Sequence, residues 1–228
     1  MPIPLRKKLA AECFGTFCLV GTGAITINEV SGGVVSHVGI ALTFGLIVLA
    51  MIYTLGDISG SHLNPAVTVG FYLARRFEGK WVLPYVSSQC LGAVAGSLLL
   101  RVLFWESFSL GGTTPAGSAM QSFLLEIVLT SMLLMVIFSV STGAKENGVT
   151  AGIAVGAMIA LEALVAGPIS GASMNPARSL GPAVVSGRWS DLWLYLLAPQ
   201  LGAVLAVPVC RCIREPACCA GVAKGECP

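Results

Sequence analysis

Two stretches of the sequence decide the fold. "ISGSHLNPAV" runs from Ile58 to Val67, and "ISGASMNPAR" runs from Ile169 to Arg178. Six of the ten positions are identical, and Asn-Pro-Ala occupies the same place in both. The second copy ends in Arg where the first ends in Val, so the two copies are related but not interchangeable.

The composition of the chain is that of a membrane protein. Of its 228 residues, 55% are hydrophobic and only 11% are charged, and the mean hydropathy is +0.85. A soluble domain carries about 25% charged residues, so the shortfall excludes an ordinary soluble core. The formal net charge is +2, which provides no strong basic field for nucleic acid. We therefore expect the lipid bilayer, and no nucleic acid, as a partner.

Apolar stretches long enough to cross a bilayer occur six times. A hydrocarbon layer of about 30 Å needs about 20 helical residues. The segments that meet this requirement are roughly 9–28, 38–56, 82–104, 122–141, 149–166 and 192–213. The quoted stretches lie between spans, at 58–75 after the second span and at 169–186 after the fifth. The sequence therefore predicts an all-α, multi-pass membrane protein.

An even number of spans puts both chain ends on one side. Most Lys and Arg residues fall on that side, and an excess of them marks the cytoplasmic face; the exceptions are Arg101, Arg178 and Arg188. We expect a protein of the plasma (inner) membrane with both termini in the cytoplasm. A cysteine-rich tail occupies about 214–228. Its spacing matches no zinc pattern, so we expect no metal and no cofactor, although a soft metal or a palmitoyl group on this tail stays open.

The two halves of the chain resemble each other beyond the quoted stretches. Glu12 and Glu126 lie early in the first span of each half, and the tetrapeptide Leu-Gly-Ala-Val recurs in the third. Each half holds three spans, and an odd number reverses the orientation in the membrane. The sequence therefore predicts one transmembrane domain, residues 1–228, with inverted repeats at about 5–105 and 118–213.

The quoted stretches carry the local signals of helix starts. Asn is among the best N-capping residues and Pro is favoured at the first helical position, so Asn64-Pro65 and Asn175-Pro176 should each begin a helix. Each helix is too short to cross a bilayer, and irregular backbone at membrane depth survives only when it is buried in protein or lines a water-filled space. Two inverted half-helices should therefore meet N-terminus to N-terminus. The capping amides should keep both N–H donors free toward the space between them.

In these features the chain resembles the aquaporin (major intrinsic protein) family over roughly residues 5–213, and "AGPISGASMNPARSLGPA" is similar to the nodulin-26-like branch and its bacterial relatives. The resemblance rests on the paired motif residues Asn64, Pro65, Ala66, Asn175, Pro176 and Ala177. It implies the aquaporin fold of six transmembrane helices and two re-entrant half-helices, assembled as a homotetramer. It also implies a passive channel, not an enzyme, that excludes protons and ions. The permeating species would be water and small uncharged solutes such as glycerol and, in that branch, metalloid acids such as arsenite or boric acid.

The same resemblance implies a selectivity filter formed by Phe44, Ala163, Ala172 and Arg178. Water-selective members carry His at the fifth-span position, where this chain has Ala163, so the opening should be wider and less polar. A charged guanidinium at membrane depth indicates function, although a structural Arg paired to an acid stays open. The alternative is a water-selective channel whose filter is narrowed by Glu162, Met158 or a loop residue.

Other charged and titratable residues of the spans lead to further expectations. Glu12 and Glu126 resemble the family's paired acids, which accept hydrogen bonds from the half-helix loops. Glu162 departs from the family pattern, and pairing with Arg178, bonding to loop backbone and protonation all stay open. His37 lies near the outer end of the second span, where a solvated or interfacial side chain is expected.

Two other classes of transport protein fit parts of the pattern. A secondary transporter also uses inverted repeats and broken helices, but the sequence shows no substrate-sized set of charged residues at the midplane. A cation channel would need a ring of acids or a Gly-rich carbonyl filter, and the half-helices present the wrong sign of dipole. A passive pore is therefore the leading hypothesis.

Overall fold

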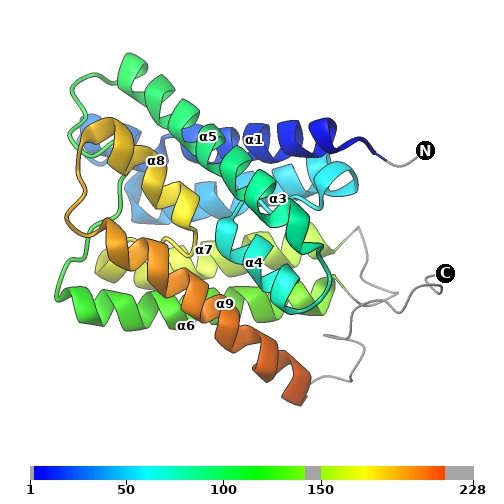
Figure 1. Ribbon diagram of the computed structural model, residues 1–228. Coiled ribbons are helices and arrows are strands. Elements are labelled where there is room, and N and C mark those ends of the chain that lie inside the picture. Colours follow the sequence, from blue (N-terminus) through cyan, green and yellow to red (C-terminus); the bar gives the residue numbers. More distant parts are fainter. Residues whose placement is uncertain (1–2, 142–149, 214–228) are drawn as a thin grey trace.

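The computed structural model describes residues 3–141 and 150–213, and these ranges fold into helices joined by turns and loops (Figure 1). The cysteine-rich tail at 214–228 lies outside the described residues. In chain order the helices are α1 (Leu5–Gly21), α2 (Ala24–Val30), α3 (Ser36–Ser59), α4 (Pro65–Leu73), α5 (Gly79–Leu103), α6 (Ala119–Val140), α7 (Ala151–Ser170), α8 (Pro176–Ser186) and α9 (Leu192–Ile213).

Six segments of the described chain are long and apolar enough to cross a membrane. They are α1 together with α2, and then α3, α5, α6, α7 and α9. The predicted all-α fold with six spans is thereby confirmed. The first span, expected as one helix over 9–28, is broken between α1 and α2. Gly23 at the break has a φ of 63°, which is the left-handed conformation that glycine adopts without steric penalty.

The two halves repeat the same helix packing. α1 packs along α5 in the first half, and α6 packs along α9 in the second. Each contact is made close by a glycine, because a Cβ on Gly92 of α5 would collide with the carbonyl oxygen of Cys13, and a Cβ on Gly202 of α9 would lie 2.6 Å from that of Ile127. Small residues allow this backbone approach between membrane helices. The same device at matching positions is a structural sign of the inverted repeat.

The halves are joined through α3 and α7, which pack against each other along their lengths. Gly45 and Gly156 face each other here, and a Cβ on Gly45 would lie 2.5 Å from the Gly156 carbonyl oxygen. Both helices are longer than the sequence indicates. α3 ends at Ser59 rather than 56, and α7 continues through Pro168 to Ser170 rather than ending at 166.

The two short helices complete the bundle. α4 packs on α9 and α8 packs on α5, so that each half-helix contacts a span of the other half. In Figure 1 they point toward each other near the middle of the molecule. Because α3 and α7 extend further than expected, the irregular backbone shrinks to residues 60–64 and 171–175. The predicted re-entrant half-helices are present, beginning at Pro65 and Pro176.

Large apolar side chains cover much of the outer surface of the bundle. Leu83, Val102 and Val165 are examples, with more than half of each side chain exposed. A continuous apolar surface of this kind is unfavourable in water and suits contact with lipid. Polar residues such as Glu12, Asn64, Glu126 and Asn175 are buried inside the bundle instead.

Candidate functional site: a cavity between the two half-helices

Each half-helix begins with an asparagine cap. Asn64 has an extended backbone, and its Oδ1 accepts a hydrogen bond from the Ala66 N–H at 2.8 Å. Asn175 does the same, and its Oδ1 accepts from the N–H groups of Ala177 at 3.0 Å and Arg178 at 3.3 Å. These bonds satisfy backbone donors that the first helical turn leaves unpaired. The amide oxygen is thereby committed to the local helix.

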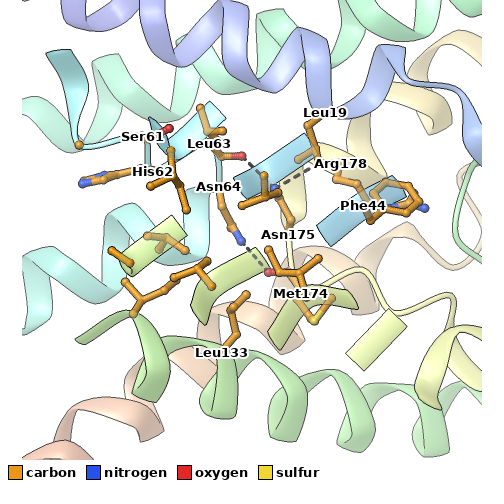
Figure 2. Close-up of a pocket in the computed structure, with 18 of the residues that line it drawn as sticks. Leu19, Phe44, Ser61, His62, Leu63, Asn64, Leu133, Met174, Asn175 and Arg178 are labelled. Carbon is orange, nitrogen blue, oxygen red and sulfur yellow. Dashed lines mark hydrogen bonds between the residues drawn. The ribbon is translucent and has the colours of Figure 1, made fainter. Parts of the chain in front are cut away.

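The amide nitrogens link the two halves. Asn64 Nδ2 donates to the Met174 carbonyl at 2.8 Å, and Asn175 Nδ2 donates to the Leu63 carbonyl at 2.9 Å; Figure 2 shows both bonds as dashed lines. The expectation that both N–H groups of each amide stay free is therefore wrong. One N–H of each amide donates to a carbonyl of the opposite loop, because the two helix starts lie close together. The second N–H of each amide remains for a molecule in the cavity.

Two buried carboxylates hold the loops that precede the caps. Glu12 on α1 accepts from the N–H groups of His62 at 2.9 Å and Leu63 at 2.7 Å. Glu126 on α6 accepts from those of Ser173 at 2.8 Å and Met174 at 2.7 Å. A serine hydroxyl, from Ser59 or Ser170, adds a further donor to each carboxylate at 2.7 Å. Hydrogen bonds to an ionised acceptor are the stronger kind, so each acid fixes its loop.

The loops turn carbonyl oxygens toward the cavity. In a trans peptide the N–H and C=O groups point in opposite directions, so the N–H groups that face Glu12 direct the carbonyls of Ser61 and His62 away from it. Alternate residues of each loop have left-handed backbone, with φ of 49° at Ser61, 50° at Leu63, 42° at Ala172 and 52° at Met174. Such conformations strain non-glycine residues and persist only where surrounding contacts impose them. The glutamates supply those contacts.

A cavity of about 140 Å³ lies between these elements. One part of its wall is polar and is made of the two loops with Asn64 and Asn175. The rest is mainly apolar and comes from four of the spans, with side chains that include Leu19, Phe44, Val48, Leu133, Ile137, Val155 and Ile159. One polar side and one apolar side suit a file of water or a solute that has both a hydrocarbon face and hydroxyl groups.

Arg178 lies at one end of the cavity beside Phe44, as Figure 2 shows. The guanidinium carbon lies 5.1 Å from the centre of the Phe44 ring, and Nη1 donates to the Gly111 carbonyl at 2.8 Å. Only 4% of the side chain is exposed, and Nη2 has no protein partner. Among the described residues no carboxylate lies within salt-bridge distance of Arg178. Nη2 is therefore a buried donor without a protein partner, on a residue that lines this end of the cavity.

Two alanines face the same region. Ala163 of α7 and Ala172 of the second loop both contribute to the wall, together with Phe44 and Arg178. Neither Glu162 nor Met158 contributes to it. The alternative in which one of these two side chains narrows the opening is therefore not supported by their positions. Met174, a loop residue, does line the cavity, so the alternative in which a loop residue narrows the opening stays open.

Glu162 is directed into the protein interior instead. Its side chain is 2% exposed, and neither carboxylate oxygen has a hydrogen-bond partner. It does not pair with Arg178 and does not bond to loop backbone, so two of the three possibilities left open by the sequence are excluded. An unpaired ionised carboxylate in an apolar interior is very costly. Protonation is the possibility that remains.

The sequence did not indicate the loop that contacts Arg178. This loop joins α5 to α6, and Glu29 of α2 holds it by accepting bonds from Ser107 Oγ at 3.0 Å, the Phe108 N–H at 2.8 Å and Ser109 Oγ at 2.7 Å. The acceptor for Arg178, the Gly111 carbonyl, follows two residues later. Because it is a backbone oxygen in a loop 67 residues away, no side-chain motif could reveal it.

Comparisons with known proteins agree with this geometry. The sequence profile of a family described as "Major intrinsic protein" matches residues 2–209. The chain belongs to the major intrinsic protein family. It is 46% identical over 217 residues to Aquaporin NIP1-1 of Oryza sativa subsp. japonica, which covers 93% of this chain and 76% of the rice protein. Nodulin-26 of Glycine max is 42% identical over 217 residues, covering 93% and 79%.

A solved structure shares the fold as well. The X-ray structure of the aquaglyceroporin from Plasmodium falciparum superimposes with a TM-score of 0.79 at 25% identity, covering 90% of this chain and 95% of that one. Family membership and fold together make this major intrinsic protein an integral, multi-pass membrane channel for water and small solutes rather than an enzyme.

Proposed function

We propose that this major intrinsic protein conducts water together with small uncharged solutes, of which glycerol and neutral metalloid acids such as arsenious or boric acid are the favoured class. The observation that carries the proposal is the composition of the cavity wall around Arg178. There the small side chains of Ala163 and Ala172 stand where a wider side chain would narrow the opening, and Glu162 points elsewhere. The related aquaglyceroporin of known structure supports a glycerol-sized solute.

In this proposal Phe44, Ala163, Ala172 and Arg178 form the selectivity filter. The Phe44 ring offers an apolar wall to the carbon backbone of a polyol. The free Nη2 of Arg178 donates to a hydroxyl oxygen, and its positive charge repels cations. A neutral solute with hydroxyl groups along one edge matches this arrangement, because the donor replaces water at the hydroxyl groups while the carbon backbone meets apolar surface.

Protons and ions are excluded at the paired asparagines. α4 and α8 direct the positive ends of their dipoles at the same region, about half a charge each, which opposes any cation there. A water that accepts from the remaining N–H of Asn64 and of Asn175 has both lone pairs occupied, so it cannot take a proton from its neighbour. In aquaporin-type pores generally, pore diameter, lining donors and such electrostatic barriers govern selectivity. Pro65 and Pro176 begin the two half-helices, and the buried Ala66 and Ala177 that follow them complete the paired motifs.

The chain would act as one channel domain over residues 1–228, with its repeats at about 5–105 and 118–213. We place it in the plasma (inner) membrane with both termini in the cytoplasm. Arg75 and Arg76, at the turn between α4 and α5, and Lys80, in the first turn of α5, then lie on the face that Lys and Arg favour. Each chain holds its own cavity, and we propose a homotetramer of such chains. Native mass spectrometry in a mild detergent tests the assembly, and a monomer alone would refute it.

The conduction proposal is tested by stopped-flow light scattering on proteoliposomes. Water, glycerol, boric acid and arsenious acid are applied in turn, and the ionic and proton currents are recorded from the same preparation in a planar bilayer. We expect water and solute flux that is linear with the gradient and carries no current. A protein that passes water but none of the three solutes would be the water-selective alternative, and saturable, coupled flux would indicate a secondary transporter.

A further inference from the structure

One carbonyl of α7 has lost its helical donor. In an α-helix the carbonyl of residue i accepts from the N–H of residue i+4, and proline has no N–H. Pro168 lies inside α7, so it cannot donate to Leu164, yet the helix continues to Ser170. The Leu164 carbonyl is therefore left without a donor from its own helix.

His37 supplies that donor from the neighbouring helix. Its Nε2 lies 2.7 Å from the Leu164 oxygen. A carbonyl can only accept, so Nε2 carries the hydrogen. Gly167 leaves room for the ring, since a Cβ there would lie 2.8 Å from His37 Cε1. A proline that frees an acceptor, a glycine that opens a space and a histidine that fills it are three separate features of the same contact. The ring is exposed at the surface, as expected, but it is not simply solvated.

The contact lies between the two helices that carry Phe44 and Ala163, two of the four proposed filter residues. His37 is in the first turn of α3, and Phe44 follows seven residues later, which is about two helical turns on the same face. Leu164 directly follows Ala163 on α7. Below this level the two helices are held by close backbone packing at Gly45 and Gly156. Toward the outer ends of the two helices, the hydrogen bond from the His37 side chain joins them.

We propose that His37 is a positioning residue of the filter: by donating to the carbonyl that Pro168 leaves free, it sets the distance between α3 and α7 where Phe44 and Ala163 face the cavity. It touches no solute itself. Its effect is on the width of the opening, so it acts on the discrimination between glycerol and water. The predicted effect on glycerol permeability rests on the proposed function. The coupling between His37 and Pro168 does not, and it can be tested separately.

The first experiment compares three variants in proteoliposomes. His37→Leu removes the donor, His37→Gln keeps an N–H at similar reach, and Val38→Leu changes a neighbouring exposed residue as a control. We expect His37→Leu to raise the ratio of glycerol to water permeability by about two- to tenfold, the range to which the net contribution of one hydrogen bond converts. His37→Gln and Val38→Leu should stay near wild type. A ratio unchanged in His37→Leu, or shifted equally in Val38→Leu, overturns the proposal.

The second experiment is a double-mutant cycle. Pro168→Ala restores an N–H to α7, so the Leu164 carbonyl regains a helical donor and no longer depends on His37. His37→Leu should then change the permeability ratio little in the Pro168→Ala background. An effect of equal size in both backgrounds overturns the proposal, because a histidine that merely packed on the surface would not sense the proline.

The outcomes separate this inference from the proposed function. If wild-type protein passes no glycerol, the proposed function fails, while the coupling between His37 and Pro168 can still be read from water permeability and from the midpoint of thermal unfolding. If His37→Leu alone does not reconstitute, recovery when it is combined with Pro168→Ala supports the coupling between His37 and Pro168. Failure of both His37→Leu and the combined variant to reconstitute overturns the proposal.

Discussion

Asn64 and Asn175 each donate an amide hydrogen to the carbonyl that precedes the other, Asn64 to Met174 at 2.8 Å and Asn175 to Leu63 at 2.9 Å. Each side chain thus caps its own half-helix with oxygen and holds the opposite loop with nitrogen. The two bonds are related by the inverted repeat, and neither half can make them alone. The two asparagines therefore form a joint between the repeats, in addition to the role as donors to water that we propose for them.

Replacing Asn64 by Asp tests this double role. Asp is an equally good N-cap, so the start of α4 should survive. The donor to the Met174 carbonyl is lost, however, and leaving that buried acceptor unpaired costs about 1–3 kcal/mol. A negative charge also enters the region where the helix dipoles oppose cations. We expect a lower midpoint of thermal unfolding and a measurable cation current in planar bilayers. Asn175→Asp should act in the same direction, and an unchanged current in both would contradict the electrostatic role.

Ala163→His tests the filter. The imidazole adds bulk and polarity at the point where the cavity wall is formed by small side chains. We expect glycerol permeability to fall about tenfold or more relative to water permeability, since a barrier change of about 1.4 kcal/mol is already tenfold. Glu162→Gln is the matched control, because Glu162 adjoins Ala163 in the sequence but its side chain does not line the cavity. Equal losses of water and glycerol flux would show that the site is not selective.

Glu12 and Glu126 offer a matched pair for stability. Glu12 accepts from Ser59, His62 and Leu63 and also from Gln89 Nε2 at 2.8 Å, whereas Glu126 has no counterpart of the last donor among the described residues. Hydrogen bonds to charged groups contribute about 1.5–3 kcal/mol each.

We therefore expect Glu12→Gln to lower the midpoint of thermal unfolding in detergent more than Glu126→Gln does. Both substitutions turn an N–H donor toward backbone N–H groups. Glu106→Gln, on an exposed side chain, should leave the midpoint unchanged. The reverse order of the first two variants would mean that the loops are held mainly by other contacts.

Gly45→Ala tests the close packing of α3 on α7. The added methyl would lie 2.5 Å from the Gly156 carbonyl oxygen and 2.7 Å from Ala160 Cβ, so the helices must separate. Overpacking of this kind destabilises by about 1–3 kcal/mol. The midpoint of thermal unfolding should fall, and solute selectivity should relax because the same helices carry Phe44 and Ala163. Gly56→Ala on the same helix meets only Ile52 at 4.0 Å and should be tolerated.

Glu162→Leu removes a buried carboxyl that has no hydrogen-bond partner. Replacing an unpaired buried polar group by an apolar group of similar volume is often neutral or stabilising. We expect an unfolding midpoint equal to or above that of wild type, with the ratio of glycerol to water permeability unchanged. A large loss of stability would show that the carboxyl has a partner in the membrane, such as a buried water.

The chain itself determined those features whose partners lie close together in sequence. The cap from Asn64 to the Ala66 N–H spans two residues, and the proline that follows marks the first helical turn, so the half-helices could be predicted from local chemistry. The six spans follow from apolar length alone. The pairing of Asn-Pro-Ala motifs in halves of odd span number then predicts the inverted arrangement. The side chains of the cavity wall could be named only through the family resemblance.

Only the tertiary structure decided the contacts that join distant segments. Asn64 meets Met174 across 110 residues, Arg178 meets Gly111 across 67, and His37 meets Leu164 across 127. In each case the acceptor is a backbone carbonyl, which every residue possesses, so the sequence carries no mark of which one is used. The direction of the Glu162 side chain is likewise undetermined by sequence. Neighbouring residues of a helix point about 100° apart, so a small rotation of α7 about its axis decides whether a side chain lines the cavity or packs between helices. Helix packing sets that rotation.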